Sequence, residues 1–275
     1  MRIETIDESV QRQRRKPARP AIGLQTPVGM QIEPYRWQLS GGAIAHLFKA
    51  TTQQHHRALA STIAGLVPPA AVVFDVGAHA GQFTKLFARA AAQGRVYAVE
   101  PGSYARAILR TVVWLHRLGN VAVLPMALGA VSGLDTLTLP VKGRGSLGFG
   151  LAHLGAAEDR WHKVAQELVA LTTLDAVVAA LGLDRVDFIK ADIEGWELRL
   201  LHGSVDTLRR FRPRLMLELT EQHLARAGDR LDDAFAFLDG LDYAALEFAP
   251  GRGLIPVATH HDGDFWFIPR EESAA

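Results

Sequence analysis

From residue 70 onward, short runs of β-branched and aromatic residues alternate with helical segments, and this alternation limits the chain to few folds. We predict strands at 71–75, 96–100, 121–127, 186–191 and 215–219, and helices at 80–92, 103–118, 176–181, 196–210 and 231–238. Strand runs without a polar alternation are typical of strands that are buried on both faces. Repeated βα units predict an α/β fold with a doubly wound, mostly parallel sheet and a ligand at the carboxyl ends of its strands.

The remaining segments predict additions to this sheet. Residues 136–140 suggest an antiparallel excursion, 168–173 a strand, and 243–248 with 264–268 a C-terminal antiparallel hairpin. Before residue 70 we expect a short strand that includes Val28, Met30 and Ile32, and then a helix from about residue 40 to 66. That helix would bury an apolar stripe of Ile44, Leu47, Phe48, Leu59 and Ile63. We therefore divide the chain into an N-terminal strand and helix extension, residues 1–69, and a ligand-binding domain, residues 70–270.

Composition excludes several classes of protein. Thirty basic and 29 acidic residues leave a net charge of +1, which argues against dependence on a nucleic acid. The first twenty residues hold six basic and three acidic side chains, which we interpret as a solvated basic arm. There is no cysteine, no apolar run near the roughly 20 residues of a membrane span, and no apolar region typical of a secretory signal. We expect a cytoplasmic protein.

The strongest local motif is the turn Asp75-Val-Gly77-Ala-His79-Ala-Gly81, between the first predicted strand and helix. Its glycines allow a tight turn and a close approach of a ligand to the backbone. A dinucleotide fingerprint has the spacing G-x-G-x-x-G, whereas this turn has G-x-x-x-G with a carboxylate two residues before the first glycine. A carboxylate would repel a pyrophosphate but suits an ammonium or sulfonium group, which favours S-adenosylmethionine as the ligand.

Two further positions extend this interpretation. Glu100 ends the second predicted strand, 19 residues after Gly81, close to the spacing at which an acidic side chain binds ribose hydroxyls. Ala127 follows the third strand, where a small side chain would leave room for an adenine ring. A plain glycine turn and a solvated strand end are the structural alternatives.

The second informative block is Val186-Asp-Phe-Ile-Lys190-Ala-Asp192-Ile-Glu194-Gly195-Trp196-Glu197, which delivers carboxylates at another strand end. With this block, the ordered motifs DVGAHAG, YAVEP, TTLD and DFIKADIEGWE resemble those of the FkbM-type S-adenosylmethionine-dependent methyltransferases, over about residues 70–270. The resemblance implies a class I, Rossmann-like methyltransferase domain. It also implies that Asp75, Gly77 and Gly81 face the methionine portion of the cofactor, Glu100 its ribose, and Asp192 the junction of cofactor and acceptor. His79 stands where the family commonly has asparagine, and we include it among the cofactor-binding residues.

The resemblance implies O-methylation of a carbohydrate, glycolipid or secondary metabolite, with a small-molecule or glycan hydroxyl as acceptor. We predict Asp192 and Glu194 as catalytic residues, with Asp192 as the base or as the group that orients the acceptor. In the alternative, Asp192 caps the next helix, Glu194 is a first-turn acid stabilised by the helix dipole, and Glu197 is a structural partner. His79, His116, His202 and His223 are other candidate bases.

The sequence leaves four properties open. We expect no metal, but Asp192, Glu194 and Glu218 could supply oxygen ligands to Mg²⁺. The chain could instead be an NAD-dependent oxidoreductase or a non-catalytic methyltransferase-like binding module. The glycine-rich segment 143–150 could cover the acceptor or be an ordinary loop, and a homodimer is compatible with the sequence.

Overall fold

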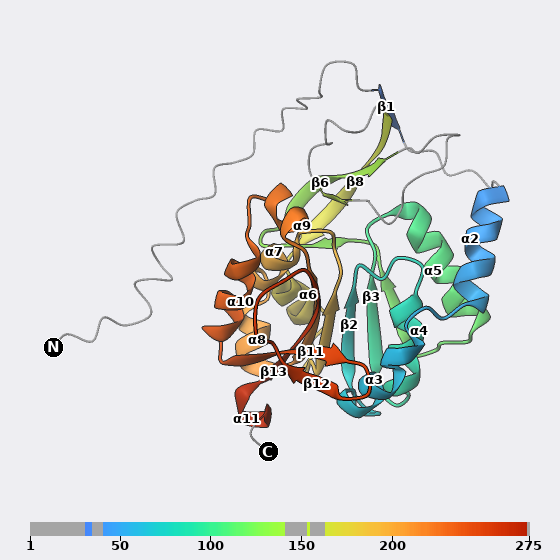
Figure 1. Cartoon of the computed structure of the whole chain (residues 1–275). Helices are drawn as coiled ribbons and strands as arrows, with labels where there is room; N and C mark the ends of the chain where they lie inside the picture. Colours follow the sequence, from blue (N-terminus) through green and yellow to red (C-terminus); the bar gives the residue numbers. More distant parts are fainter. Residues whose placement is uncertain (1–30, 35–40, 141–152, 155–162, 274–275) are drawn as a thin grey trace.

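The computed structural model describes residues 31–34, 41–140, 153–154 and 163–273, and within them the main sheet has eight strands (Figure 1). Their order is β12-β11-β13-β10-β9-β2-β3-β4. The central strands are parallel, while β13 pairs antiparallel with both β10 and β11. The bounds are β2 Val72–Val76, β3 Arg95–Val99, β4 Val121–Leu124, β9 Phe188–Ala191, β10 Arg214–Leu219, β11 Tyr243–Ala249, β12 Gly253–Pro256 and β13 Gly263–Pro269. This arrangement confirms the predicted mostly parallel sheet with a C-terminal antiparallel hairpin.

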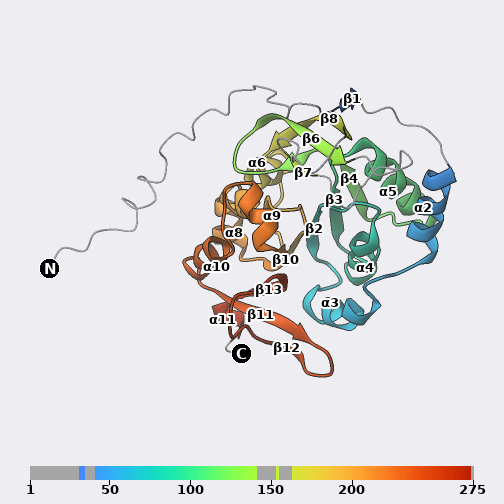
Figure 2. The same cartoon turned by 45° about the horizontal axis from the view of Figure 1, so that its top comes forward.

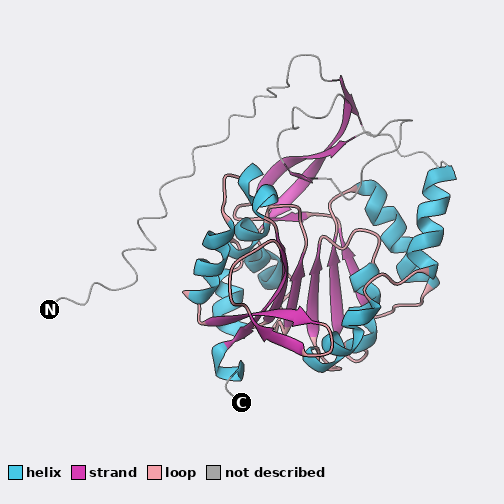
Figure 3. Cartoon of the chain, in the orientation of Figure 1, coloured by secondary structure: helices cyan, strands magenta, loops and turns pink. Residues whose placement is uncertain are grey.

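Helices cover both faces of the main sheet, with α4 and α5 on one side and α8 and α10 on the other (Figures 1 and 3). The helices after β2 are α4 Gln82–Ala90, α5 Ser103–Leu115, α6 Leu174–Ala180, α7 Glu197–His202, α8 Val205–Phe211, α9 Glu221–Arg226, α10 Leu231–Asp239 and α11 Arg270–Ser273. Successive strand residues point to opposite faces, so Phe188 packs under α4 while Ile189 packs under α6 and α8. Burial on both faces explains why these strands lack polar alternation.

Two predicted helices are each divided in the structure, so the prediction of continuous helices was wrong there. The segment 40–66 forms α2 (Gly41–Thr52), a 3₁₀ turn η1 (Arg57–Leu59) and α3 (Ala60–Leu66). The buried Lys85 ammonium accounts for the first break, because it binds the carbonyls of Ala50 and Gln53 at 2.7 and 2.8 Å and so caps α2. Ile44 and Phe48 of the predicted apolar stripe are exposed on α2.

The second break divides the predicted helix 196–210 into α7 and α8 at Gly203. A Cβ atom at Gly203 would lie 2.0 Å from the carbonyl oxygen of Gly129, so the two backbone segments meet closely at this point. The Ser204 hydroxyl also donates to the carbonyl of Leu200 at 2.5 Å. The chain therefore turns where it packs against the loop after β5.

A smaller sheet lies over the carboxyl ends of β2 and β3 (Figure 2). It comprises β1 Gln31–Pro34, β5 Ala127–Leu128, β6 Gly133–Pro140, β7 His153–Leu154 and β8 Lys163–Thr172. Strand β8 pairs antiparallel with β6 and parallel with β1 and β5. The antiparallel excursion is confirmed, but the predicted strand 121–127 ends at Leu124, because Ala127 pairs with Leu171 of this second sheet.

Three sequence predictions concern residues outside those that the structure describes. The basic arm and the whole glycine-rich segment 143–150 lie there, as do Val28 and Met30, whereas Ile32 lies in β1. Within the described residues, no helix combines the length and the apolar character needed to cross a lipid bilayer.

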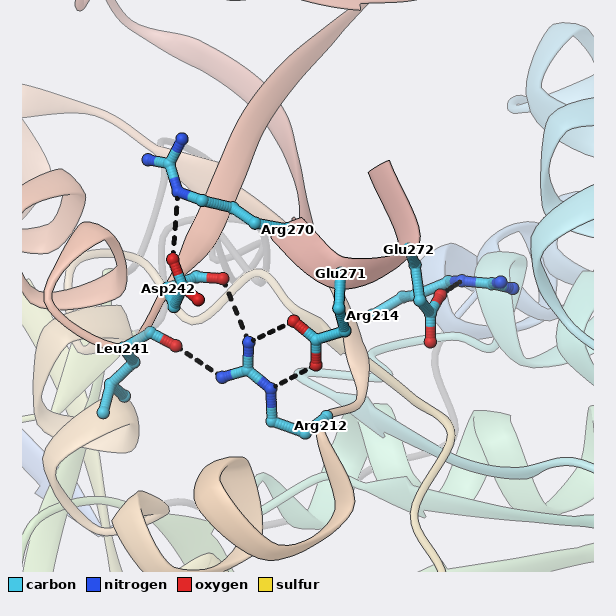
Figure 4. A network of polar contacts seen from close by, with 7 residues as sticks. All are labelled: Arg212, Arg214, Leu241, Asp242, Arg270, Glu271 and Glu272. Atoms are coloured by element: carbon cyan, nitrogen blue, oxygen red, sulfur yellow. Dashed lines mark hydrogen bonds and ion pairs between the residues drawn. The ribbon is translucent and has the colours of Figure 1, made fainter. Parts of the chain in front are cut away.

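A network of ion pairs attaches the C-terminal helix α11 to the start of β10 (Figure 4). Arg212 binds both carboxylate oxygens of Glu271 at 2.9 Å, and Arg214 binds Glu272 at 2.9 Å. Arg212 also donates to the carbonyl oxygens of Leu241 and Asp242. Exposed pairs contribute at most about 1 kcal/mol each, so we expect the network mainly to hold β13 in place beside β10.

Candidate active site

A cavity of about 320 Å³ opens at the carboxyl ends of the central strands. The strand order reverses between β2 and β9, and a ligand is expected at such a switch point. The small sheet closes the cavity from the opposite side, with Leu137, Leu139 and Glu167 in its wall. Six of the residues predicted from the sequence line it, namely Gly77, His79, Glu100, Ala127, Asp192 and Glu194, and Glu218 lines it as well.

The glycine turn after β2 has the backbone that its sequence predicts. Gly77 and Gly81 have φ values of 72° and 83°, in the region that favours glycine. A Cβ at Gly77 would lie 1.9 Å from the carbonyl oxygen of Asp192, so only glycine lets the turn approach the end of β9. Gly81 precedes α4 and is not in the cavity wall; its missing side chain leaves space for Leu109. The turn thus brings the first and fourth parallel strand ends together.

The side chain of Asp75 lies behind the cavity wall. Its carboxylate is fully buried, accepts a 2.5 Å hydrogen bond from the Thr84 hydroxyl, and lies 3.8 Å from the Lys190 ammonium. Burial raises the pKa of Asp75, while Lys190 and the Thr84 hydrogen bond act in the opposite direction. The contact of Asp75 with the methionine portion of a cofactor stays a prediction, and in the structure its neighbours are protein groups.

Glu100 joins the ends of β2 and β3. Its Oε2 accepts a 2.8 Å hydrogen bond from the backbone N–H of His79, and its Oε1 accepts one of 2.8 Å from Gly102. Burial raises the pKa of Glu100 to about 7, although both backbone hydrogen bonds favour the anion. The carboxylate is therefore fixed at the cavity wall with lone pairs left for a ligand.

His79 has a φ of 46° and an imidazole whose Nε2 is buried without a hydrogen-bond partner among the described residues. Burial, with a smaller contribution from nearby His46, lowers the pKa of His79 to about 4. The His46 ring, from α2, lies 5.5 Å from it. A neutral imidazole with a buried, unpaired ring nitrogen is thus part of the cavity lining in the described residues.

Asp192 follows β9 and lines the cavity. Its side chain is 38% exposed, and its Oδ2 lies 3.5 Å from the Lys190 ammonium. Burial opposes ionisation, but Lys190 and a hydrogen bond with Glu218 outweigh it, so the pKa of Asp192 lies below its ordinary value. Burial and the same contact with Asp192 raise the pKa of Glu218 to about 9. At neutral pH Glu218 therefore keeps its proton and donates a hydrogen bond to the anionic Asp192 carboxylate.

Glu194 and Glu197 have different surroundings from Asp192. The Glu194 carboxylate lies 3.1 Å from His223 Nδ1, and burial with the Asp192 charge raises the pKa of Glu194 to about 7. Glu197 is buried and accepts backbone hydrogen bonds from Ile193 and Gly195 at 2.8 and 3.0 Å. These two hydrogen bonds tie the Glu197 carboxylate to the backbone of the segment after β9. Of the other candidate bases, His116 and His202 do not line the cavity.

The three carboxylates considered for Mg²⁺ do not point to one place. Asp192 and Glu218 share a hydrogen bond, while Glu194 turns toward His223. Among the described residues, no group of three or more histidine, aspartate or glutamate side chains is arranged to hold a metal ion.

Several cavity residues had no predicted role. Lys190 stands out in the sequence, since a lysine inside a buried strand requires a charged partner, but the partner's identity depends on the fold. Glu167 on β8 lines the cavity and accepts hydrogen bonds from Ser103 at the start of α5. No local pattern marks Glu167, Tyr104 or Trp196 for the cavity wall.

A family model described as the methyltransferase FkbM domain matches residues 75–245 of this chain. Three solved structures are similar to it. An FkbM methyltransferase from Methylobacillus flagellatus KT is 19% identical, with 76% of this chain and 47% of that chain covered at a TM-score of 0.49. A precorrin-6y C5,15-methyltransferase from Geobacter metallireducens GS-15 is 16% identical, covering 80% and 90%, TM-score 0.41. A SAM-dependent O-methyltransferase from Thermotoga maritima is 14% identical, covering 82% and 69%, TM-score 0.41.

This chain aligns with less than half the length of the Methylobacillus protein. No curated protein matches the sequence. The family match covers well over half of the chain and contains the glycine turn, Glu100, Ala127 and the end of β9. The chain belongs to the FkbM family of S-adenosylmethionine-dependent methyltransferases, and its main sheet has a doubly wound α/β order.

Proposed function

We propose that this protein transfers a methyl group from S-adenosylmethionine to a hydroxyl oxygen of a carbohydrate, glycolipid or secondary metabolite. The observation that carries the proposal is the anionic Asp192 carboxylate, which opens into the cavity beside the glycine turn. An alcohol is a weak nucleophile until a base takes its proton. The Asp192 carboxylate can accept that proton. A base at this position therefore suits a hydroxyl group as the methyl acceptor.

The cavity fits the proposed cofactor. Its volume of about 320 Å³ falls within the roughly 300–1,000 Å³ of small-molecule sites. Glu100 presents a carboxylate with free lone pairs, which suits the two hydroxyls of a ribose. The buried Nε2 of His79 has no partner among the described residues, so a polar ligand atom would satisfy it. Ala127 leaves space beside Glu100 for a ring.

When bound, S-adenosylmethionine would supply a methyl group whose carbon an acceptor oxygen attacks in line, and the sulfur would leave as a neutral thioether with the electron pair of the broken carbon–sulfur bond. Asp192 accepts the hydroxyl proton as the new carbon–oxygen bond forms. Glu218 donates its hydrogen bond to Asp192 before the transfer and keeps the carboxylate from rotating away. The glycine turn, which would also contact the cofactor, packs against the end of β9. It therefore fixes the distance between Asp192 and the cofactor.

Two measurements test the proposal. Calorimetry should give micromolar binding of S-adenosylmethionine and of its demethylated product, and far weaker binding of NAD. Transfer of labelled methyl groups should then appear in hydroxyl-bearing carbohydrates, glycolipids or small metabolites. Equal or tighter binding of NAD would favour an oxidoreductase. Cofactor binding without transfer to any acceptor of these classes would favour a binding module without turnover.

Chelation separates proton transfer by Asp192 from metal assistance. The Lys190 ammonium lies 3.5 Å from Asp192, where its positive charge would repel a metal ion. We therefore expect full activity in EDTA. Loss of activity in EDTA that added Mg²⁺ restores would assign Asp192 and Glu218 to a metal site instead.

A further inference from the structure

Lys190 is a charged residue in the middle of the main sheet. It lies on β9, in register with Asp75 of β2 on one side and Met216 of β10 on the other. Register partners on neighbouring strands point to the same face, so Asp75 and Lys190 extend together into the protein. The Lys190 residue is only 3% exposed, and it nevertheless forms part of the cavity wall.

The ammonium of Lys190 connects the two motifs that the sequence marks. Its Nζ lies 3.8 Å from Asp75 Oδ1, 3.5 Å from Asp192 Oδ2 and 3.3 Å from the carbonyl oxygen of Gly77. Asp75 belongs to the glycine turn motif and Asp192 to the end of β9. One cation therefore contacts the loop assigned to the cofactor and the carboxylate assigned to the acceptor.

The two carboxylates on either side of Lys190 differ in access to the cavity. Asp75 is fully buried and balances the ammonium within the protein, whereas Asp192 is 38% exposed. A buried ammonium without an anionic partner is strongly unfavourable, so Asp75 accounts for the charge of Lys190 inside the sheet. The second contact, to Asp192, places that charge beside the one carboxylate of the pair that can reach a ligand.

We propose that Lys190 is a positioning residue: its ammonium donates to the carbonyl oxygen of Gly77 and holds the Asp192 carboxylate at the end of β9. This inference rests on the proposed function, because it assigns Lys190 a role in the same proton transfer. Lys190 acts through Asp192 and takes no proton from the acceptor itself. The charges of Asp192 and Asp75 support this role. Burial lowers the pKa of Lys190, but the two carboxylates outweigh burial and raise it, so Lys190 stays charged.

Other titratable groups also face this pair and must be counted in any pH dependence. They are Asp75 from β2, His79 from the glycine turn, His56 from the residue before η1, Glu194 and Glu197 from the segment after β9, Glu218 from β10 and Asp264 from β13. Lys190 is the one cation among them that lies within 4 Å of Asp192 in the described part of the chain. Its removal should therefore raise the pH at which Asp192 loses its proton.

The test uses Lys190→Met, which removes the charge and keeps most of the length. Carboxyl ¹³C NMR of the cofactor-free protein would follow Asp192 between about pH 3 and pH 8, with the signal assigned by its absence in Asp192→Asn. We expect the titration midpoint of Asp192, and the acidic limb of the kcat profile, to move to higher pH together. At neutral pH we expect kcat to fall about ten- to hundredfold, the cost of a misplaced catalytic group. Lys190→Arg should restore part of the kcat and move the Asp192 titration midpoint part of the way back to the parent value.

Two further variants separate the loss of the Lys190 charge from a loss of folding. Lys190→Met leaves Asp75 buried without a cation, so the double variant Lys190→Met/Asp75→Asn removes both charges and should fold while keeping the shifted titration. Lys85→Met is the matched control, because Lys85 is also buried but binds the carbonyls of Ala50 and Gln53. It should lower stability and leave the Asp192 titration unchanged.

An unchanged Asp192 titration and pH profile in a folded Lys190→Met or double variant would overturn the proposal. The same shift in Lys85→Met would also overturn it. Failure of the proposed function looks different, because the parent protein would then transfer no methyl group to any hydroxyl acceptor while Asp192 still titrated as described.

Discussion

The backbone N–H of His79 donates a 2.8 Å hydrogen bond to Oε2 of Glu100, and this contact joins the glycine turn after β2 to the end of β3. It fixes Glu100 at the cavity wall with one lone pair of each carboxylate oxygen already used, since Oε1 accepts from Gly102. Two ribose hydroxyls could use the remaining lone pairs only if the carboxylate is ionised.

Cofactor affinity should therefore rise with pH up to about 7, the pKa to which burial raises Glu100. The increase should be at most about tenfold per pH unit, as one proton is released on binding. Calorimetry between pH 5.5 and 8.5 (roughly one and a half units on each side of 7) measures it. Glu100→Gln should bind the cofactor weakly at every pH, and an equally steep dependence in this variant would transfer the effect to another group.

Ionisation of Glu100 should lower the stability of the cofactor-free protein as pH rises, whereas it increases cofactor affinity. The pKa of Glu100 is higher in the folded chain than its ordinary value of 4.5. Its contribution to stability is therefore present below about pH 4.5 and is lost as pH rises through about 7. Thermal unfolding of the cofactor-free protein should show a smaller decrease over this pH window in Glu100→Gln than in the parent.

Asp192→Asn should keep the fold and most of the cofactor affinity while lowering turnover by roughly 10²–10⁴, the usual loss for a general base. Asparagine has nearly the same shape and still accepts a hydrogen bond from Glu218, so the change isolates charge and basicity. Turnover on the identified acceptor measures the effect. Glu194→Gln should cost less than about tenfold, because Glu194 faces His223; a larger loss there than in Asp192→Asn would reverse the two roles.

Asp75→Ala should weaken cofactor binding about ten- to a hundredfold, as expected for the loss of a charge-assisted contact of roughly 1.5–3 kcal/mol. Because the buried carboxylate contacts Lys190 and Thr84, we expect these two neighbours to transmit the effect to the cofactor. Thr84→Val removes the hydroxyl and keeps the carboxylate, and it should weaken binding less. Calorimetry measures the cofactor affinity of both variants. An unchanged affinity in Asp75→Ala would remove Asp75 from the cofactor site.

Gly77→Ala should lower the free energy of unfolding by more than about 3 kcal/mol, since a Cβ there combines a positive φ with a clash against the carbonyl of Asp192. Gly182→Ala is the matched control, because Gly182 also has a positive φ of 61° but no heavy atom lies within 4 Å of its Cβ. It should cost only about 1–2 kcal/mol. Urea denaturation measures both, and equal losses would show that the contact with Asp192 is unimportant.

Local patterns in the sequence were sufficient to predict the order of the central strands along the chain and the glycine turn. They also placed Glu100 and Asp192 at strand ends. These features depend on runs of a few residues, because burial on both faces requires apolar strands and positive φ favours glycine. The division at residue 69 and the roles of the site residues remain predictions, since the arrangement of the backbone does not test them.

Only the tertiary structure decided which carboxylates reach the cavity. Asp75 and Asp192 both follow apolar strand residues, yet Asp75 is buried against Lys190 and Thr84 while Asp192 opens to the ligand space. The breaks at the end of α2 and at Gly203 likewise depend on Lys85 and Gly129, which are distant in the sequence. The physical reason is that desolvation and ion pairing are properties of neighbours in space, and 115 residues separate Asp75 from Lys190 in the chain.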